Sequence, residues 1–99
     1  MKIRSKSFLG GMMTIYAVCL NEPSEDAWDN VREEWGGKHF ILSPTTAFVA
    51  SPDLTLTSEI ARKVGISDET GTLGVVFEVQ AYNGFNRSDL WEWLRKAEA

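Results

Sequence analysis

The sequence has little with which to build a metal or redox site. It contains one cysteine, Cys19, and one histidine, His39, among 99 residues. A structural zinc ion needs three or four such ligands, so these two residues cannot hold one. A single cysteine also excludes an intramolecular disulfide, which favours a reducing cytoplasm as the location. We interpret Cys19 as core packing and His39 as a surface or strand-edge residue, with acid–base chemistry left open for His39.

Long apolar runs are also missing. No apolar stretch approaches the roughly 20 residues that span a membrane. Lys2, Arg4 and Lys6 are followed only by Ser-Phe-Leu-Gly, which is too short for the apolar segment of a signal peptide. We interpret residues 1–11 as a disordered leader, either a cloning remnant or an over-long start. A native basic arm is the alternative.

Positive charge is scarce after this leader. Three of the ten basic residues lie in it, so residues 12–99 hold seven basic and fourteen acidic residues, a net charge of −7. Such a surface repels phosphate at long range, so nucleic acid is not favoured as a partner. The length fits one domain, and we expect residues 12–99 to form a single one.

The residue patterns predict the order β-α-β-β-α-β-α. Strands are expected at 14–20, 39–42, 46–50 and 73–82, where β-branched and aromatic residues cluster or alternate. Helices are expected between Ser24 and Gly36, before Gly65 with Leu56, Ile60 and Val64 on one face, and after Asn86 or Ser88. This order matches an α+β, ferredoxin-like βαββαβ sandwich with an added C-terminal helix.

The first predicted strand is apolar on both sides. Its alternating side chains are Ile15, Ala17 and Cys19 on one face, and Tyr16, Val18 and Leu20 on the other. A strand that is apolar on both faces is usually covered on both faces. The second cover is either the C-terminal helix or another subunit, and a homodimer is the more economical explanation.

The motifs that could carry chemistry have simpler explanations. Gly36-Gly37-Lys38 is typical of a helix end rather than a phosphate loop, because a helix precedes it and a strand follows. The acidic residues of the first helix suit a helix start and a solvent face without magnesium. We therefore predict no catalytic residue, no metal and no cofactor.

The best candidate for a ligand or partner site is the loop before the last helix. Tyr82, Phe85 and Arg87, together with Trp91, combine large aromatic groups with a cation. Loops at strand ends often bind ligands, and an aromatic at the margin of a helix stripe is often an interface anchor. Alternatively, Asn83-Gly84 is only a turn, Phe85 fills the core and Trp91 packs at its edge.

Residues 14–95 resemble a known family in order and spacing. The segments concerned are YAVCLN, FILSPTTAFVAS, LTSEIARKV and WEWL. They are similar to the small ferredoxin-fold family of CRISPR-associated endoribonuclease-like and SinR-like proteins. In its nuclease members an aspartate after the first strand, one from each subunit, holds a metal at the dimer interface.

Asn21 stands at that position here, and Glu22 is the one candidate substitute. An amide offers a metal only a neutral oxygen. The resemblance therefore implies fold and dimerisation more than activity.

Three hypotheses follow. The first is a small, non-enzymatic, homodimeric binding or accessory protein of bacterial type, with a protein as its partner. The second is a metal-dependent nuclease of the resembled family, acting through Asn21 or Glu22. The third is a small-molecule-sensing module that uses the loop from Tyr82 to Arg87.

Overall fold

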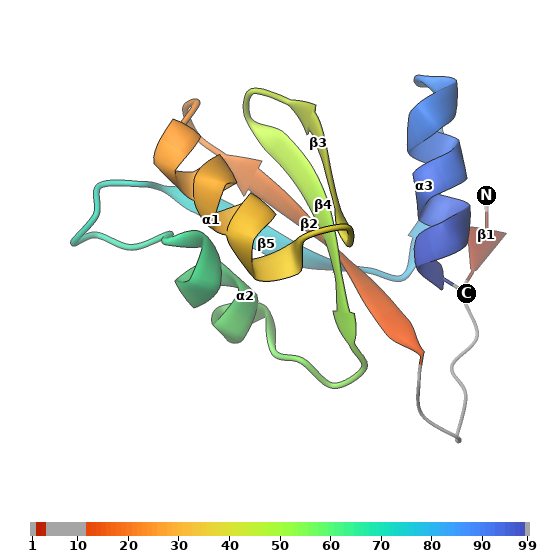
Figure 1. Ribbon diagram of the computed structural model, residues 1–99, viewed down its shortest axis with the longest axis horizontal. Helices are drawn as coiled ribbons and strands as arrows, with labels where there is room; N and C mark the ends of the chain where they lie inside the picture. Colours follow the sequence, from red (N-terminus) through yellow and green to blue (C-terminus); the bar gives the residue numbers. More distant parts are fainter. Residues whose placement is uncertain (1, 4–11, 99) are drawn as a thin grey trace.

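The computed structural model describes residues 2–3 and 12–98. Over these residues the chain forms two antiparallel sheets and three helices, an α+β arrangement (Figure 1). The elements in chain order are β1 (Lys2–Ile3), β2 (Met13–Leu20), α1 (Glu25–Trp35), β3 (His39–Ser43), β4 (Thr46–Pro52), α2 (Thr57–Val64), β5 (Gly74–Val79), β6 (Ala81–Tyr82) and α3 (Ser88–Glu98).

The larger sheet has the strand order β3-β4-β2-β5, and every neighbouring pair is antiparallel. β3 and β5 are therefore its two edges. The register places Ala17 of β2 opposite both Phe48 of β4 and Phe77 of β5, and places Phe48 opposite Phe40 of β3. Because residues that lie opposite one another point to the same side, these four side chains form one row across the whole sheet.

Helices α1 and α2 cover one face of this sheet (Figure 1). Both helices present apolar stripes, and the even-numbered side chains of β2 face them. The buried cluster between these layers consists of Tyr16, Val18, Leu20, Ala27, Trp28, Val31, Trp35, Ala47, Val49, Ile60 and Val64. This cluster is the main core of the molecule.

Helix α3 covers only part of the opposite face. Its Leu90 and Leu94 are buried in a second cluster with Ile15 of β2, as the apolar stripe of the last helix predicts. Val75 and Phe77 of β5 point to the same face, yet they keep 50% and 56% of their surfaces exposed. The second face of β2 is thus covered at Ile15 and open farther along the sheet.

Several predicted helix signals are confirmed. The Ala27 N–H donates to Ser24 Oγ at 3.2 Å, so Ser24 caps α1. Gly65 ends α2 in the left-handed region with φ 96°, and the Ile66 N–H donates to the Ala61 carbonyl at 3.0 Å. This is the Schellman arrangement that Gly65-Ile66 predicts.

The prediction that Leu56 shares the buried face of the second helix is wrong. α2 begins at Thr57, and Leu56 precedes its first turn with 60% of its surface exposed. The segment before it is fixed to β2 instead. Thr14 Oγ1 donates to Asp53 Oδ1 at 2.6 Å, and the Tyr16 hydroxyl donates to the Thr55 carbonyl.

The long strand predicted at 73–82 is broken. β5 ends at Val79, and β6 (Ala81–Tyr82) pairs with β1 in the smaller sheet. Only Lys2 and Ile3 of the predicted leader 1–11 are described, and the remainder of that prediction lies outside the described residues. No helix in the described part of the chain has the length and apolarity needed to cross a membrane.

Candidate functional site

A cavity of about 210 Å³ lies between α3 and the uncovered side of the sheet. Tyr82, Phe85 and Trp91, three of the four residues predicted for a ligand or partner rim, line it together. We call it the α3 cavity. Its lining consists of Leu42, Phe48, Val79, Tyr82, Asn83, Gly84, Phe85, Asn86, Leu90, Trp91 and Leu94.

The aromatic residues of this cavity differ in how they are held. The rings of Tyr82 and Trp91 stack with centroids 6.1 Å apart and planes 19° apart. Both residues are partly buried against the cluster under α3. Phe85 is wholly exposed, which removes the alternative that it fills the core. The preceding Gly84 has φ 149°, a value that favours glycine and turns the loop at this point.

Arg87, the fourth predicted rim residue, lies beside the cavity and is already engaged. Its Nε and Nη2 donate to the two carboxylate oxygens of Asp89 at 3.0 and 2.7 Å. Its Nη1 donates to the Leu42 carbonyl at 3.4 Å, and the guanidinium lies 5.2 Å from the Phe40 ring centroid. Arg87 therefore ties the start of α3 to β3.

The ion pair between Arg87 and Asp89 shifts the pKa values of both side chains. Hydrogen bonding to Arg87 lowers the pKa of Asp89, and hydrogen bonding to Asp89 raises the pKa of Arg87. Both groups stay charged near neutral pH and cancel one another. Arg87 is therefore not a free cation for an anionic ligand at the rim of the α3 cavity.

A partly exposed apolar surface adjoins the α3 cavity. It consists of the exposed Val75 and Phe77 and the partly buried Ala17, Cys19 and Phe48, and we call it the open sheet face. Phe48 belongs to both features, so cavity and face are continuous. Val75 and Phe77 were not among the predicted site residues. The signal was present in the strict alternation of residues 73–79.

Asn21 and Glu22 line a different hollow, of about 300 Å³, at the end of β2. The hollow is shared with Ser24 and with residues 71–73, and the Asn21 N–H donates to the Leu73 carbonyl at 2.8 Å. In a continuing strand, the side chains of Asn21 and Glu22 would point to opposite faces. Because β2 ends at Leu20, this alternation does not apply to them. Glu22 is the one charged residue of the lining.

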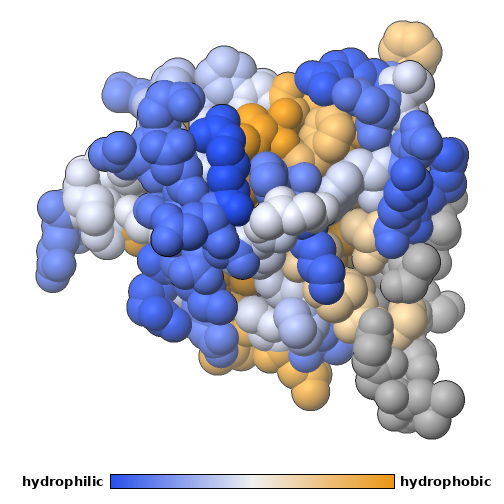
Figure 2. Space-filling model, viewed as in Figure 1, coloured by the Kyte–Doolittle hydropathy of each residue, from blue (hydrophilic) through white to orange (hydrophobic). Residues whose placement is uncertain are grey.

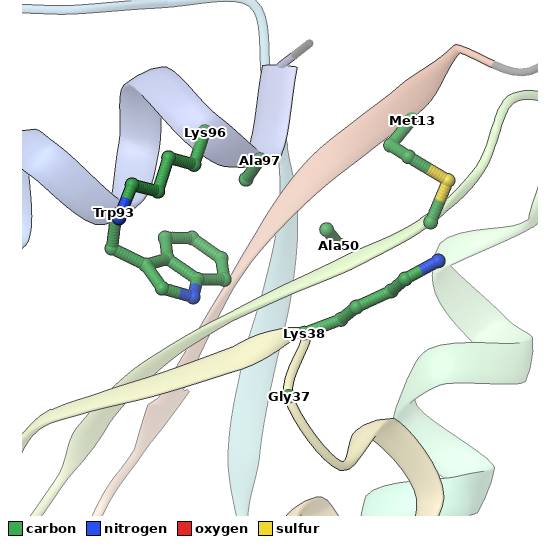
Figure 3. Close-up of a pocket in the computed structure, with 7 residues that line it drawn as sticks. All are labelled: Met13, Gly37, Lys38, Ala50, Trp93, Lys96 and Ala97. Carbon is green, nitrogen blue, oxygen red and sulfur yellow. The ribbon is translucent and has the colours of Figure 1, made fainter.

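A third cavity, of about 320 Å³, lies between the C-terminal half of α3 and the start of β3 (Figure 3). Lys38, Trp93 and Lys96 line it with smaller residues. In Figure 3 the Lys38 amine extends toward Met13 and away from α3. Lys96 Nζ lies 3.8 Å from Glu92 Oε1. The two amines do not converge, so this cavity lacks the focused charge of an anion site.

Groups suited to catalysis are not gathered in the part of the chain that the structure describes. Arg87 and Asp89 have shifted pKa values, and the ion pair between them is the main cause of both shifts. No three His, Cys, Asp or Glu side chains among residues 12–98 form a group able to hold a metal. The His39 Nδ1 is hydrogen-bonded to the Gly36 carbonyl, and Cys19 lies half-buried in β2.

Charge is distributed unequally over the molecule. α1 exposes the acidic residues Glu25, Asp26, Asp29, Glu33 and Glu34. Figure 2 shows hydrophilic side chains over the α1 and α2 side, with apolar ones gathered over β3 beside α3. The rows that contain Ala17 and Cys19 on the other face hold no charged side chain within the described strands.

The chain matches no family model, no curated protein and no solved structure. Its function is therefore inferred from these surfaces.

Proposed function

We propose that this chain is a small, non-enzymatic binding or accessory protein that acts as a homodimer, with the open sheet face as the contact between its two copies. One observation carries the proposal. Val75 and Phe77 stand half-exposed on an apolar face of which α3 covers only one part. Contiguous apolar surface of this kind marks interaction sites in soluble proteins.

The charge distribution favours the open sheet face over the α1 side as the place where two copies meet. The chain carries a formal net charge of −4, so two copies repel one another on average. The acidic exposed side of α1 increases this repulsion, whereas the open sheet face is uncharged. An isologous contact through that face brings apolar rows together and keeps the two α1 helices apart.

The non-enzymatic part of the proposal rests on the state of the polar groups. Catalytic acids and bases usually have pKa values shifted by burial or by charges in a cleft. The shifted pair here, Arg87 and Asp89, is an exposed ion pair that holds α3 to β3. A structural role accounts for it fully.

The fold belongs to the same proposal. We infer a ferredoxin-like βαββαβ sandwich with α3 added at its C-terminal end. The order β3-β4-β2-β5, the antiparallel neighbours and the position of α1 and α2 on one face support this arrangement. Dimerisation of such a domain is also what the family resemblance implies.

Sedimentation velocity over low to high micromolar protein tests the proposal. We expect the wild-type chain to sediment as a concentration-dependent dimer. Phe77→Asp puts a charge within the contact, so it should raise the dissociation constant about tenfold or more. A wild-type chain that stays monomeric throughout this range contradicts the proposal.

Leu54→Asp is the matched control. Leu54 is also an exposed apolar residue, at 87%, but it follows the end of β4 that pairs with the start of β2. The same substitution there adds the same charge away from the open sheet face. Equal weakening of the dimer by both variants would show a general charge effect and would remove the open sheet face as the contact.

A further inference from the structure

Phe85 is the feature of the α3 cavity that its own chain leaves without a role. The side chain is wholly exposed although it stands at the mouth of an apolar cavity. A phenylalanine covers about 150–250 Å² when it is buried, so leaving it in water forgoes a large hydrophobic gain. Tyr82 and Trp91 beside it are packed against each other and against α3.

The size of the cavity indicates what it accepts. Its volume of about 210 Å³ is smaller than the roughly 300–1,000 Å³ of most small-molecule sites. It exceeds the roughly 150 Å³ of an apolar cavity that binds benzene. The α3 cavity therefore suits one aromatic ring better than a metabolite.

The rim of the cavity allows a second copy to approach. Arg87 and Asp89 neutralise each other there, at an N···O distance of 2.7 Å. Phe48 joins the cavity to the open sheet face, so one contact between two copies can include both.

Two-fold symmetry then determines the occupant. In an isologous dimer the same surface of each copy meets its equivalent, so a residue beside the symmetry axis contacts the partner's neighbouring surface. Phe85 adjoins its own α3 cavity. A two-fold axis near this loop places each Phe85 at the mouth of the opposite cavity.

We propose that the two copies exchange Phe85 reciprocally, each ring entering the α3 cavity of the other copy against Leu42, Leu90 and Leu94. This inference rests on the proposed homodimer and assigns its anchor. Aromatic residues that fill a partner's pocket near the centre of an interface typically dominate its binding energy.

Two variants of the full-length chain test the exchange. Phe85→Ala removes the ring and leaves the other ten lining residues of the cavity unchanged, whereas Val79→Phe fills the cavity and keeps the ring. Each should raise the dimer dissociation constant on the order of 10- to 100-fold in sedimentation experiments. Thermal melts of both variants establish that they are folded before the comparison.

Mixing the two variants gives a readout that a purely structural role would not produce. Neither variant can form either ring-in-cavity contact with itself. In a mixed dimer, Phe85 of the Val79→Phe chain can enter the intact cavity of the Phe85→Ala chain. We expect native mass spectrometry of the mixture to show the heterodimer in excess over both homodimers.

The outcomes separate this inference from the proposed function. A monomeric wild-type chain overturns both. A wild-type dimer that Phe85→Ala leaves unchanged, or a mixture without excess heterodimer, overturns the exchange and leaves the homodimer standing. A concentration-independent fall in melting temperature with Phe85→Ala, with dimerisation unaffected, assigns the ring to its own cavity and also overturns the exchange.

Discussion

Buried polar side chains hold the strands and helices of the main core in one arrangement. The Trp35 indole N–H donates to Ser51 Oγ at 2.7 Å, and the Trp28 indole N–H donates to the Pro44 carbonyl at 2.9 Å. Within the described residues, no buried side-chain nitrogen or oxygen lacks a hydrogen-bond partner. Large aromatic residues can enter this core because each indole N–H has an acceptor.

We predict that Ser51→Ala destabilises the protein through Trp35. Ser51 is 5% exposed, so its replacement leaves the indole N–H buried and unpaired. The expected loss is about 1–3 kcal/mol of unfolding free energy, measured by urea denaturation. Adding Trp35→Phe to Ser51→Ala removes the orphaned donor, so the double variant should lose less than the two single losses combined. If the loss in the double variant equals the sum of the two single losses, the hydrogen bond between Trp35 and Ser51 does not contribute to stability.

At the scale of the elements, α3 decides how much of the sheet stays open. Leu90 and Leu94 fix it over Ile15, and Arg87 fixes its start to β3. The helix therefore covers the part of the face at Ile15 and Phe48 and leaves Val75 and Phe77 half-exposed. At the end of β2, the backbones of β2 and β5 lie close together. Gly74 of β5 lies opposite Leu20 there.

We predict that Gly74→Ala disrupts this pairing while Gly37→Ala does not. A Cβ on Gly74 would lie 2.5 Å from the Cys19 carbonyl oxygen, whereas nothing lies within 4 Å of a Cβ on Gly37. The clash forces β2 and β5 apart at a cost of about 1–3 kcal/mol. Urea denaturation of both variants measures the difference. Equal stabilities would mean that β5 shifts freely.

Local patterns were sufficient to predict the elements whose signals are local. Ser24 at the start of α1 and Gly65 at the end of α2 act as their residue types predict. The exposure of Leu56 and the break after Val79 depend on contacts between distant segments, namely β2 with the loop after β4 and β1 with β6. The apolar stripe of α3 predicted a buried helix face, but no local pattern specified which part of the sheet it would cover. The apolar face with Ala17 and Cys19 was predicted, but the exposure of Val75 and Phe77 beside it was missed for this reason.

The whole molecule combines an acidic surface with an uncharged apolar contact. Because each copy carries a net charge of −4, two copies repel one another electrostatically through the solvent. In the proposed dimer, the open sheet face and the α3 cavity supply an attraction that does not depend on ions. The two contributions therefore respond differently to salt.

We predict that added sodium chloride tightens the dimer. Raising the ionic strength from about 0.01 to 0.15 M shortens the Debye length from about 30 to about 8 Å, which screens the repulsion. The apolar attraction is not weakened by this change. Sedimentation at a series of salt concentrations measures the trend. A dimer that dissociates as salt is added would instead indicate a contact held by ion pairs.

The central position of β2 also affects how the chain folds during synthesis. One neighbour of this strand, β4, is complete by Pro52, but the other, β5, begins only at Gly74. A ribosome-bound chain that ends before β5 therefore exposes one backbone edge of β2, which is a template for unwanted strand pairing. Folding of the complete sheet therefore has to wait until β5 has been synthesised, and the open edge of β2 is exposed until then.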